Sequence, residues 1–304
     1  MSGPGASLRA WAETIKLPHS VFALPFALMA TFLAGRHLPG RNWPTLGQLG
    51  LIVLCMVAAR SVAMTFNRIV DAAIDARNPR TASRALPAGL LSAGMAWGML
   101  LLSAVTFALG CMGFLLLFGN PWPMTLGGPV LLYLCGYSLT KRLTRWSHYY
   151  LGSALALSPL AAWLAIHPPS VGWPVVVLMV TVTLWVAGFD IIYACQDVEV
   201  DRREGLYSLP AQLGPGTALW IARTSHLLVI CGLALLGHLA DLGAIYAAGV
   251  VLAALLLIVE NAMVRAGDYR RVNVAFFTLN GLVSLALGAS AIVDLLVSAP
   301  ARGA

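Results

Sequence analysis

Long apolar stretches are the feature that most constrains what this chain can fold into. A transmembrane helix needs about 20 consecutive, mostly apolar residues, and nine stretches of this 304-residue chain approach or exceed that length. Only 10% of the residues are charged, against about 25% in an average soluble domain, so polar side chains are too few to cover a soluble fold. The sequence therefore predicts an all-α, polytopic membrane bundle of nine transmembrane helices. The nine stretches are residues 18–36, 46–70, 91–118, 123–140, 148–167, 173–195, 215–237, 242–264 and 272–297.

The distribution of lysine and arginine predicts how the chain is oriented. Segments on the cytoplasmic side of a membrane are enriched in these residues. If the N-terminus is cytoplasmic, 14 of the 19 lysines and arginines fall on that side and three fall on the opposite side, while Arg60 and Arg223 lie inside apolar stretches. We therefore expect a cytoplasmic N-terminus, in a membrane of the bacterial inner (cytoplasmic) type.

Composition also excludes several classes of function. The net charge of +7 comes from cations in short loops, with no basic stretch interleaved with aromatic residues, so no nucleic-acid partner is expected. The five cysteines lie inside apolar stretches and form no CxxC pair, which argues against a disulfide framework or a zinc site. Residues 1–11 lack the basic start and apolar run of a cleaved signal peptide. We expect residues 1–304 to form a single transmembrane domain.

Seven of the twelve acidic residues fall into two groups that follow apolar stretches. The first group follows residues 46–70, where Asn67, Asp71 and Asp75 recur at intervals of four residues. If the helix continues through them, these three side chains lie above one another on one face. Arg60 extends the same face into the membrane.

The second group of acids follows residues 173–195. Here Asp190, Asp197 and Asp201 are separated by seven and four residues, which again predicts a shared helix face. The nine-helix topology places both groups at cytoplasmic helix ends. Asp190 lies deeper, and an acid inside a membrane segment is a functional-site hypothesis by default.

Stacked carboxylates repel one another unless a positive charge lies between them. Mg²⁺ prefers such oxygen ligands and characteristically shares them with substrate phosphates. Two facing carboxylate pairs therefore predict a Mg²⁺-dependent site for a phosphate-bearing substrate, and nearby cations would neutralise a diphosphate leaving group. Those cations are Arg77, Arg80, Arg84, Lys141, Arg142 and Arg202.

The membrane setting predicts the rest of the substrate. A short polar head with a long hydrocarbon tail, as in an isoprenoid diphosphate, would place the head at the cytoplasmic mouth and the tail in an apolar interior. Loss of diphosphate leaves an allylic carbocation, which a water-poor cavity protects from hydrolysis. The acceptor would then be an electron-rich group.

Several simpler interpretations remain for individual residues. Arg60 is either a substrate ligand or a structural partner for Asp190 or a backbone carbonyl. His19 and His148 are typical of interfacial polar residues rather than metal ligands. An ion-coupled transporter would also use intramembrane charges, but it would show internal repeats and charges near the midplane. A CDP-alcohol phosphotransferase requires an Asp-Gly-x-x-Ala-Arg string, which is absent from the sequence.

At these residues the sequence resembles the UbiA superfamily of intramembrane prenyltransferases. That family carries an NDxxDxxxD motif and a DxxxD motif, which appear here as Asn67-Arg68-x-x-Asp71-x-x-x-Asp75 and Asp197-x-x-x-Asp201. Arg68 replaces the first aspartate of the family motif. The resemblance implies a nine-helix bundle around a central cavity that opens to the cytoplasmic loops and laterally to lipid.

The resemblance also implies a role for each matched residue. Arg60 would approach the carboxylate or hydroxyl of the acceptor, and Asp190 would lie near the reacting centre and accept the ring proton. The residues implied to hold Mg²⁺ on the diphosphate are Asp71, Asp75, Asp197 and Asp201, assisted by Asn67. The residues implied to bind or flank the diphosphate are Arg80, Arg84, Tyr137 and Lys141.

Residues 15–26 and 190–199 look like the 4-hydroxybenzoate polyprenyltransferase branch, including its relatives in the futalosine route to menaquinone. The implied activity transfers a polyprenyl group from polyprenyl diphosphate to 4-hydroxybenzoate or 1,4-dihydroxy-6-naphthoate in ubiquinone or menaquinone biosynthesis. The expected partners are these two substrates and membrane lipid. The sequence leaves open the acceptor, including the haem or lipid acceptors of other superfamily members, and the prenyl chain length.

Overall fold

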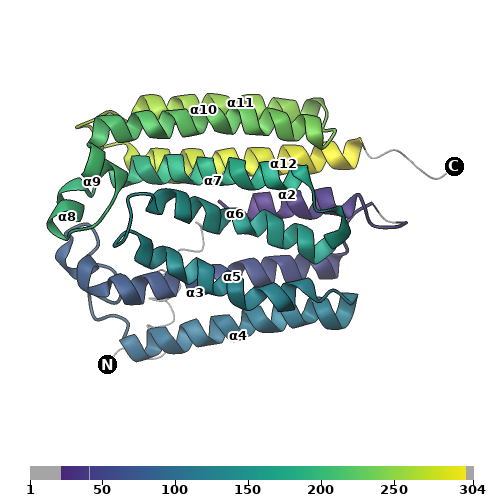
Figure 1. The fold of residues 1–304 in the computed structure, drawn as a ribbon, viewed down its shortest axis with the longest axis horizontal. Coiled ribbons are helices and arrows are strands. Elements are labelled where there is room, and N and C mark those ends of the chain that lie inside the picture. Colours follow the sequence, from purple (N-terminus) through teal and green to yellow (C-terminus); the bar gives the residue numbers. More distant parts are fainter. Residues whose placement is uncertain (1–21, 41, 299–304) are drawn as a thin grey trace.

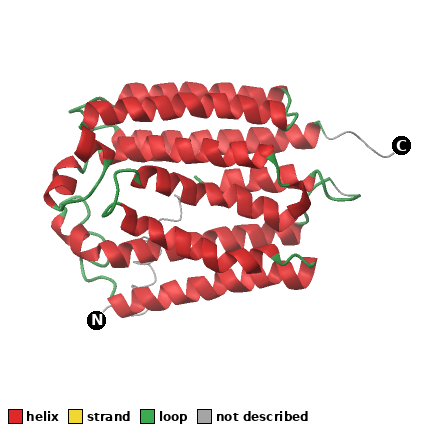
Figure 2. Cartoon of the chain, in the orientation of Figure 1, coloured by secondary structure: helices red, strands yellow, loops and turns green. Residues whose placement is uncertain are grey.

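The computed structural model describes residues 22–40 and 42–298, and helices form almost all of the regular structure in that part of the chain (Figures 1 and 2). Short elements separate or extend the long helices: α2 (Leu24–Gly35), α8 (Val198–Arg203), α9 (Leu209–Leu213), the 3-10 helix η2 (Pro168–Ser170) and the π-helix η3 (Val274–Leu279). The long helices are α3 (Leu46–Arg77), α4 (Ala93–Phe118), α5 (Trp122–Thr140), α6 (Ser147–Ile166), α7 (Trp173–Ala194), α10 (Pro215–Leu239), α11 (Ala244–Met263) and α12 (Asn280–Val297).

The all-α membrane bundle predicted from the sequence is confirmed. Within the described residues, seven helical segments are long and apolar enough to cross a membrane: α3, α4, α6, α7, α10, α11 and the continuous segment Val274–Val297. The other two predicted spans overlap α2, which is apolar and has 12 residues, and α5, whose interior contains Pro129. The first of them, 18–36, begins at residues outside the described part. The count of nine is thus confirmed for seven helices and stays a prediction for two. The predicted orientation of the N-terminus concerns residues outside the described part.

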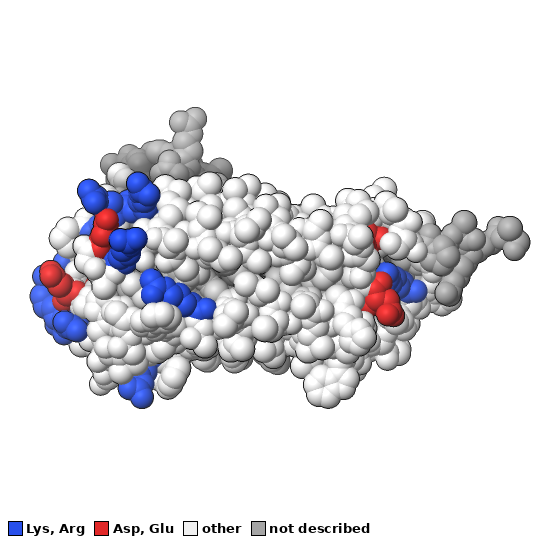
Figure 3. Space-filling model, turned by 90° about the horizontal axis from the view of Figure 1, so that it is seen from above, with Lys and Arg blue, Asp and Glu red and all other residues white. Residues whose placement is uncertain are grey.

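The long helices run side by side along one axis of the molecule (Figure 1). Helix α7 packs against both α6 and α10, while α2 packs between α6 and α12. Large apolar side chains fill the space between these helices, including Phe26, Trp163 and Trp185. On the face seen in Figure 3, charged side chains gather at the two ends of the bundle, with an uncharged band between them. That distribution fits a bundle surrounded by lipid along its middle.

Helix α3 extends beyond the predicted apolar stretch and carries the first acidic group. It starts with a capping box between Thr45 and Gln48 and continues to Arg77, seven residues past the predicted end at residue 70. It stops at Asn78, whose extended backbone is the conformation favoured by the following Pro79. The continuation places the acids of the first motif on successive turns, as the spacing predicted.

Helices α6 and α7 approach closely at a glycine. A Cβ added to Gly152 would lie 2.3 Å from the backbone oxygen of Thr183, which is too close for any atom to tolerate. Small residues at such positions allow membrane helices to pack backbone against backbone. We expect Gly152→Ala to separate the two helices and to destabilise the fold by about 1–3 kcal/mol or more.

Gly98→Ala is the matched control, because a Cβ there meets no heavy atom within 4 Å. Thermal unfolding in detergent micelles compares the two variants. Gly152→Ala is expected to lower the melting temperature and Gly98→Ala to leave it unchanged or raise it slightly, since alanine favours helix over glycine. Equal melting temperatures would contradict the close packing of α6 on α7.

Candidate active site

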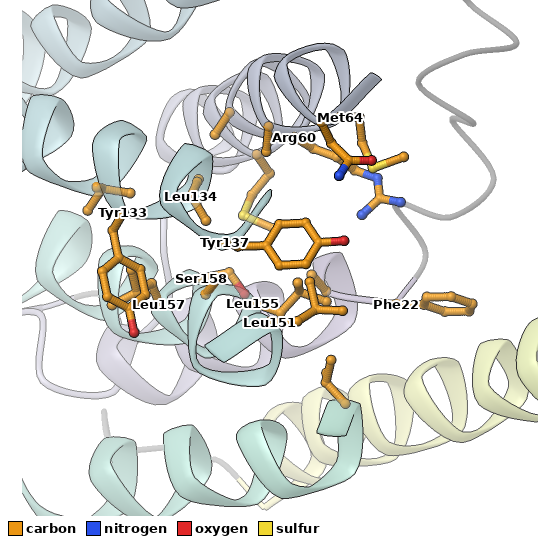
Figure 4. Close-up of a pocket in the computed structure, with 18 of the residues that line it drawn as sticks. Phe22, Arg60, Met64, Tyr133, Leu134, Tyr137, Leu151, Leu155, Leu157 and Ser158 are labelled. Atoms are coloured by element: carbon orange, nitrogen blue, oxygen red, sulfur yellow. The ribbon is translucent and has the colours of Figure 1, made fainter. Parts of the chain in front are cut away.

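A cavity of about 660 Å³ lies between α3, α5, α6 and α7, with α4, α8 and η3 adding to its wall. Figure 4 shows part of this cavity, with Arg60 and Tyr137 pointing into it. Of the cations that the sequence placed near the diphosphate, Arg77, Arg142 and Arg202 do not line the cavity. The eleven residues to which the family resemblance assigned a role all line it, although they come from segments more than 100 positions apart. They are Arg60, Asn67, Asp71, Asp75, Arg80, Arg84, Tyr137, Lys141, Asp190, Asp197 and Asp201.

Asp71 accepts more side-chain hydrogen bonds than the other carboxylate of the first motif, Asp75. Asp71 is only 2% exposed, and it accepts hydrogen bonds from Lys141 Nζ at 2.6 Å, Arg142 Nη2 at 2.9 Å and Asn67 Nδ2 at 2.9 Å. Arg142 also donates to the Val70 carbonyl, so the end of α5 is tied to α3. Burial of this carboxylate is compensated by two cations and an amide.

Asp75, one turn further along α3, pairs with a different cation. Arg84 Nη1 lies 2.7 and 2.8 Å from the two oxygens of Asp75. The loop between them folds back on the helix end, where the Thr81 hydroxyl donates to the Asp75 carbonyl at 3.0 Å. This fold-back brings Arg84 to the cavity wall beside the first motif.

The second motif faces the first across the same cavity. Asp197, in the turn between α7 and α8, accepts hydrogen bonds from Arg80 Nε at 3.0 Å and Nη2, and from Asn78 Nδ2 at 3.1 Å. The Arg80 guanidinium lies 5.1 Å from the centre of the Tyr193 ring, and Nη1 donates to the Tyr193 hydroxyl at 2.8 Å. The loop after α3 is therefore fixed directly to the end of α7.

Asp201 completes the second motif in α8. Its Oδ2 accepts a 2.6 Å hydrogen bond from the Ser208 hydroxyl. Burial raises the pKa of Asp201; the Ser208 hydrogen bond opposes the shift, whereas the neighbouring Asp197 charge adds to it. Asp201 therefore holds its proton more strongly than an exposed aspartate.

The arrangement of these carboxylates fits a metal-bound diphosphate better than a bare metal ion. Within residues 22–40 and 42–298, no three histidine, cysteine or acidic side chains are grouped closely enough to hold a metal alone. Instead Asp71, Asp75 and Asp197 are each paired with basic side chains. The phosphate oxygens of a bound diphosphate compete for such cations. The carboxylate oxygens released in this way are ligands that Mg²⁺ prefers, and they would face the same diphosphate.

Within the described residues, Arg60 forms no ion pair with an acidic side chain, unlike Arg80, Arg84 and Lys141. Its Nε is buried without a hydrogen-bond partner in the described structure, and Figure 4 shows its guanidinium on the side of the cavity toward which the Tyr137 hydroxyl points. The alternative interpretation, a structural bond to Asp190, is not what the structure shows: Asp190 Oδ2 pairs with His148 Nδ1 at 2.7 Å. A buried polar nitrogen without a hydrogen-bond partner is costly unless a ligand supplies one.

The remainder of the cavity is an apolar channel. Its lining includes Trp122 and Pro123 at one end of α5 and Lys141 just beyond the other, which at 1.5 Å per helical residue is a span of ~28 Å. In Figure 4, Leu134 and Leu155 are among the leucines that form its wall. This length and composition suit an extended hydrocarbon chain.

Sequence reasoning missed several residues that complete the site. Arg68 is buried and donates to Asn67 Oδ1 at 3.1 Å, which orients the Asn67 amide toward Asp71. His148 is buried at the start of α6, and His19 lies outside the described residues. Tyr193 had one visible signal, its position one helical turn before Asp197. His148 contacts Asp190 across two helices, a pairing that no local pattern predicts.

The chain matches the UbiA prenyltransferase family over residues 23–282. It is similar to a 4-hydroxybenzoate octaprenyltransferase of Saccharophagus degradans, with 30% identity over 96% of this chain and 95% of that protein. It is also 32% identical to a mitochondrial 4-hydroxybenzoate polyprenyltransferase of Arabidopsis thaliana over 67% of this chain, a match that spans only 49% of the plant protein. The chain thus spans about half the length of such mitochondrial relatives.

Solved structures of UbiA homologues have the same fold as this chain. The apo structure of a UbiA homologue from Aeropyrum pernix K1 has a TM-score of 0.80 and 31% identity, covering 91% of this chain and 98% of that one. A UbiA homologue from Archaeoglobus fulgidus bound to GPP and Mg²⁺ shares the fold with a TM-score of 0.67 at 16% identity, covering 93% and 99%. Since the family match spans most of its length, this chain belongs to the UbiA prenyltransferase family.

Proposed function

We propose that this protein transfers a polyprenyl group from polyprenyl diphosphate to a hydroxylated aromatic carboxylate, either 4-hydroxybenzoate or 1,4-dihydroxy-6-naphthoate, and releases diphosphate. The observation that carries the proposal is Arg60, whose Nε has no hydrogen-bond partner among the described residues. It lies in one cavity with the charged side chains of the two motifs and a long apolar channel. The names of the S. degradans and A. thaliana relatives support the choice of an aromatic acid and a polyprenyl donor.

The charged mouth of the cavity, formed by the acidic side chains of the two motifs and their basic partners, is proposed to bind the diphosphate. Arg80, Arg84 and Lys141 would exchange their carboxylate partners for phosphate oxygens, and Tyr137 would flank the same group. Mg²⁺ bound there supplies Lewis-acid stabilisation of the charge on the departing diphosphate; the A. fulgidus homologue, which binds GPP and Mg²⁺, supports this assignment. The side chains that would hold the ion are Asn67, Asp71, Asp75, Asp197 and Asp201.

The apolar channel and Arg60 are proposed to bring the two substrates together. The hydrocarbon tail would lie along α5, while the guanidinium of Arg60 would pair with the acceptor carboxylate in a charge-assisted hydrogen bond. The acceptor ring then lies between Arg60 and the diphosphate mouth. Apolar side chains around it exclude water, so the allylic cation meets the ring before it meets a hydroxide or water molecule.

The reaction is an electrophilic aromatic substitution. The bond between the allylic carbon and the diphosphate oxygen breaks, and the leaving group takes the electron pair. The π electrons of the ring form a new carbon–carbon bond to the allylic cation. Asp190 would accept the proton from the substituted ring carbon, which restores aromaticity and balances the charge.

A competition experiment tests this function. Membranes containing the protein receive Mg²⁺, a polyprenyl diphosphate and both aromatic acids, and products are identified by mass. We expect one prenylated acid and its loss when a chelator removes Mg²⁺. Which acid is prenylated assigns the acceptor, whereas the absence of both products would refute the aromatic-acid proposal and leave haem or lipid acceptors as the next candidates.

A further inference from the structure

We propose that His148 is a positioning residue that holds Asp190 ready to accept the ring proton and ties it to the diphosphate end of the site. The proposal rests on the proposed prenyl transfer, because it concerns the step that restores the aromatic ring. His148 does not line the cavity itself, so it would act through Asp190 rather than on the substrate.

The contacts of His148 determine which ring nitrogen carries hydrogen. His148 is 4% exposed at the start of α6. The backbone N–H of Leu209 points at Nε2 from 3.3 Å, and because an amide N–H only donates, Nε2 must be the unprotonated acceptor. In the neutral ring the hydrogen is then on Nδ1, which lies 2.7 Å from Asp190 Oδ2.

This tautomer fixes the position of the Asp190 carboxylate. The Nδ1–H of His148 donates to Asp190 Oδ2 at 2.7 Å and so holds one of its two oxygens in place. The Asp190 side chain is 24% exposed and lines the cavity. Because the bond to His148 uses Oδ2, Oδ1 is the oxygen left to receive the ring proton.

The same histidine connects Asp190 to the second acidic motif. Leu209, which donates to His148, is the first residue of α9, and Ser208 caps that helix by accepting the Ala211 N–H at 3.3 Å. The Ser208 hydroxyl in turn donates to Asp201 Oδ2 at 2.6 Å. The segment Ser208–Leu209 therefore bonds both to His148, behind Asp190, and to Asp201 of the second acidic motif. It connects the proposed proton acceptor to the proposed diphosphate site.

Two substitutions of His148 separate its two hydrogen bonds. In His148→Asn the side-chain amide lies near the former Nδ1, so it donates to Asp190 but leaves the Leu209 N–H without an acceptor. In His148→Gln the amide lies near the former Nε2, so it serves Leu209 and not Asp190. We expect His148→Asn to keep kcat within a few-fold of wild type, and His148→Gln to lower kcat about 10- to 100-fold with an unchanged KM for the prenyl diphosphate.

An isotope effect distinguishes positioning of a base from a structural role. The acceptor is deuterated at the ring carbons that receive the prenyl group. With wild type and His148→Asn, where proton loss is fast, kcat is expected to be the same for both isotopes. With His148→Gln, kcat is expected to fall for the deuterated acceptor, because proton loss has become slow. Adding His148→Gln to Asp190→Asn is expected to cost nothing further.

The outcomes separate failure of this inference from failure of the proposed function. If wild type forms no prenylated acid, the proposed function is wrong. If wild type is active and His148→Gln keeps its kcat, or loses rate with no isotope effect, the positioning role is wrong. If His148→Gln does not fold, the comparison of His148→Asn with Asp190→Asn replaces it: retained activity in the first and loss in the second supports the role, and equal losses overturn it.

Discussion

Asp71→Asn is expected to slow prenyl transfer by about 100- to 1000-fold, the loss typical when one preorganised charge that stabilises a transition state is removed. Asparagine keeps the size and one oxygen of the side chain but not the charge. The proposed Mg²⁺-bound diphosphate would lose a carboxylate ligand, and Lys141 and Arg142 would lose the anion that positions them at 2.6 and 2.9 Å.

The variant is expected to fold, since the two released cations are about 30% exposed and solvent screens their repulsion. Asp268→Asn is the matched control: it removes the same charge from an exposed pair with Arg270 that does not line the cavity. Initial rates in membranes, normalised to the amount of folded protein, compare the two variants. A wild-type rate in Asp71→Asn would show that the first motif does not bind the diphosphate.

The parts of this structure that sequence predicted well depend on local patterns. Apolar stretches long enough to span a membrane identified the seven confirmed helices, because a bilayer imposes the same length requirement on every span. The four-residue spacing of Asn67, Asp71 and Asp75 predicted one helix face, and α3 continues to Arg77 as that spacing requires. The apolar span ends near residue 70 because hydropathy falls there, while the helix continues with its acids neutralised by other segments.

The parts that sequence did not predict depend on contacts between distant segments. Asp71 pairs with Lys141, 70 residues away, and Asp197 pairs with Arg80, 117 residues away. No periodicity links such positions, so the sequence indicated a cluster of opposite charges without its pairing. The partner of Asp190 was missed for the same reason. The π-helix η3 within residues 272–297 had no signal in an apolar stretch.

The family motif did not predict the contact that Arg68 makes. Arg68 occupies the position of the first aspartate, and the sequence suggested only one carboxylate ligand fewer. In the structure its guanidinium donates to Asn67, which donates to Asp71. The substituted residue therefore supports the remaining carboxylate through an amide, a role that the residue type alone does not reveal.

Arg60→Gln is expected to raise the KM for the aromatic acid about 10- to 100-fold, which corresponds to the loss of a charge-assisted hydrogen bond. Arg60 has no acidic partner in the described structure, so its charge is available to the acceptor carboxylate. The KM for the prenyl diphosphate is expected to stay unchanged, because other cations line the mouth of the cavity. Steady-state kinetics with each substrate varied in turn measures both constants.

Arg223→Gln is the control for placing an arginine change inside a membrane helix, since Arg223 lies over Trp220 on α10 and does not line the cavity. The chemistry of the acceptor provides a sharper test. A phenol without the carboxylate has nothing for the guanidinium to bind, so wild type and Arg60→Gln are expected to use it equally poorly. If Arg60→Gln weakens the use of that phenol as strongly as the use of the acid, the arginine supports the fold of the cavity and does not recognise the carboxylate.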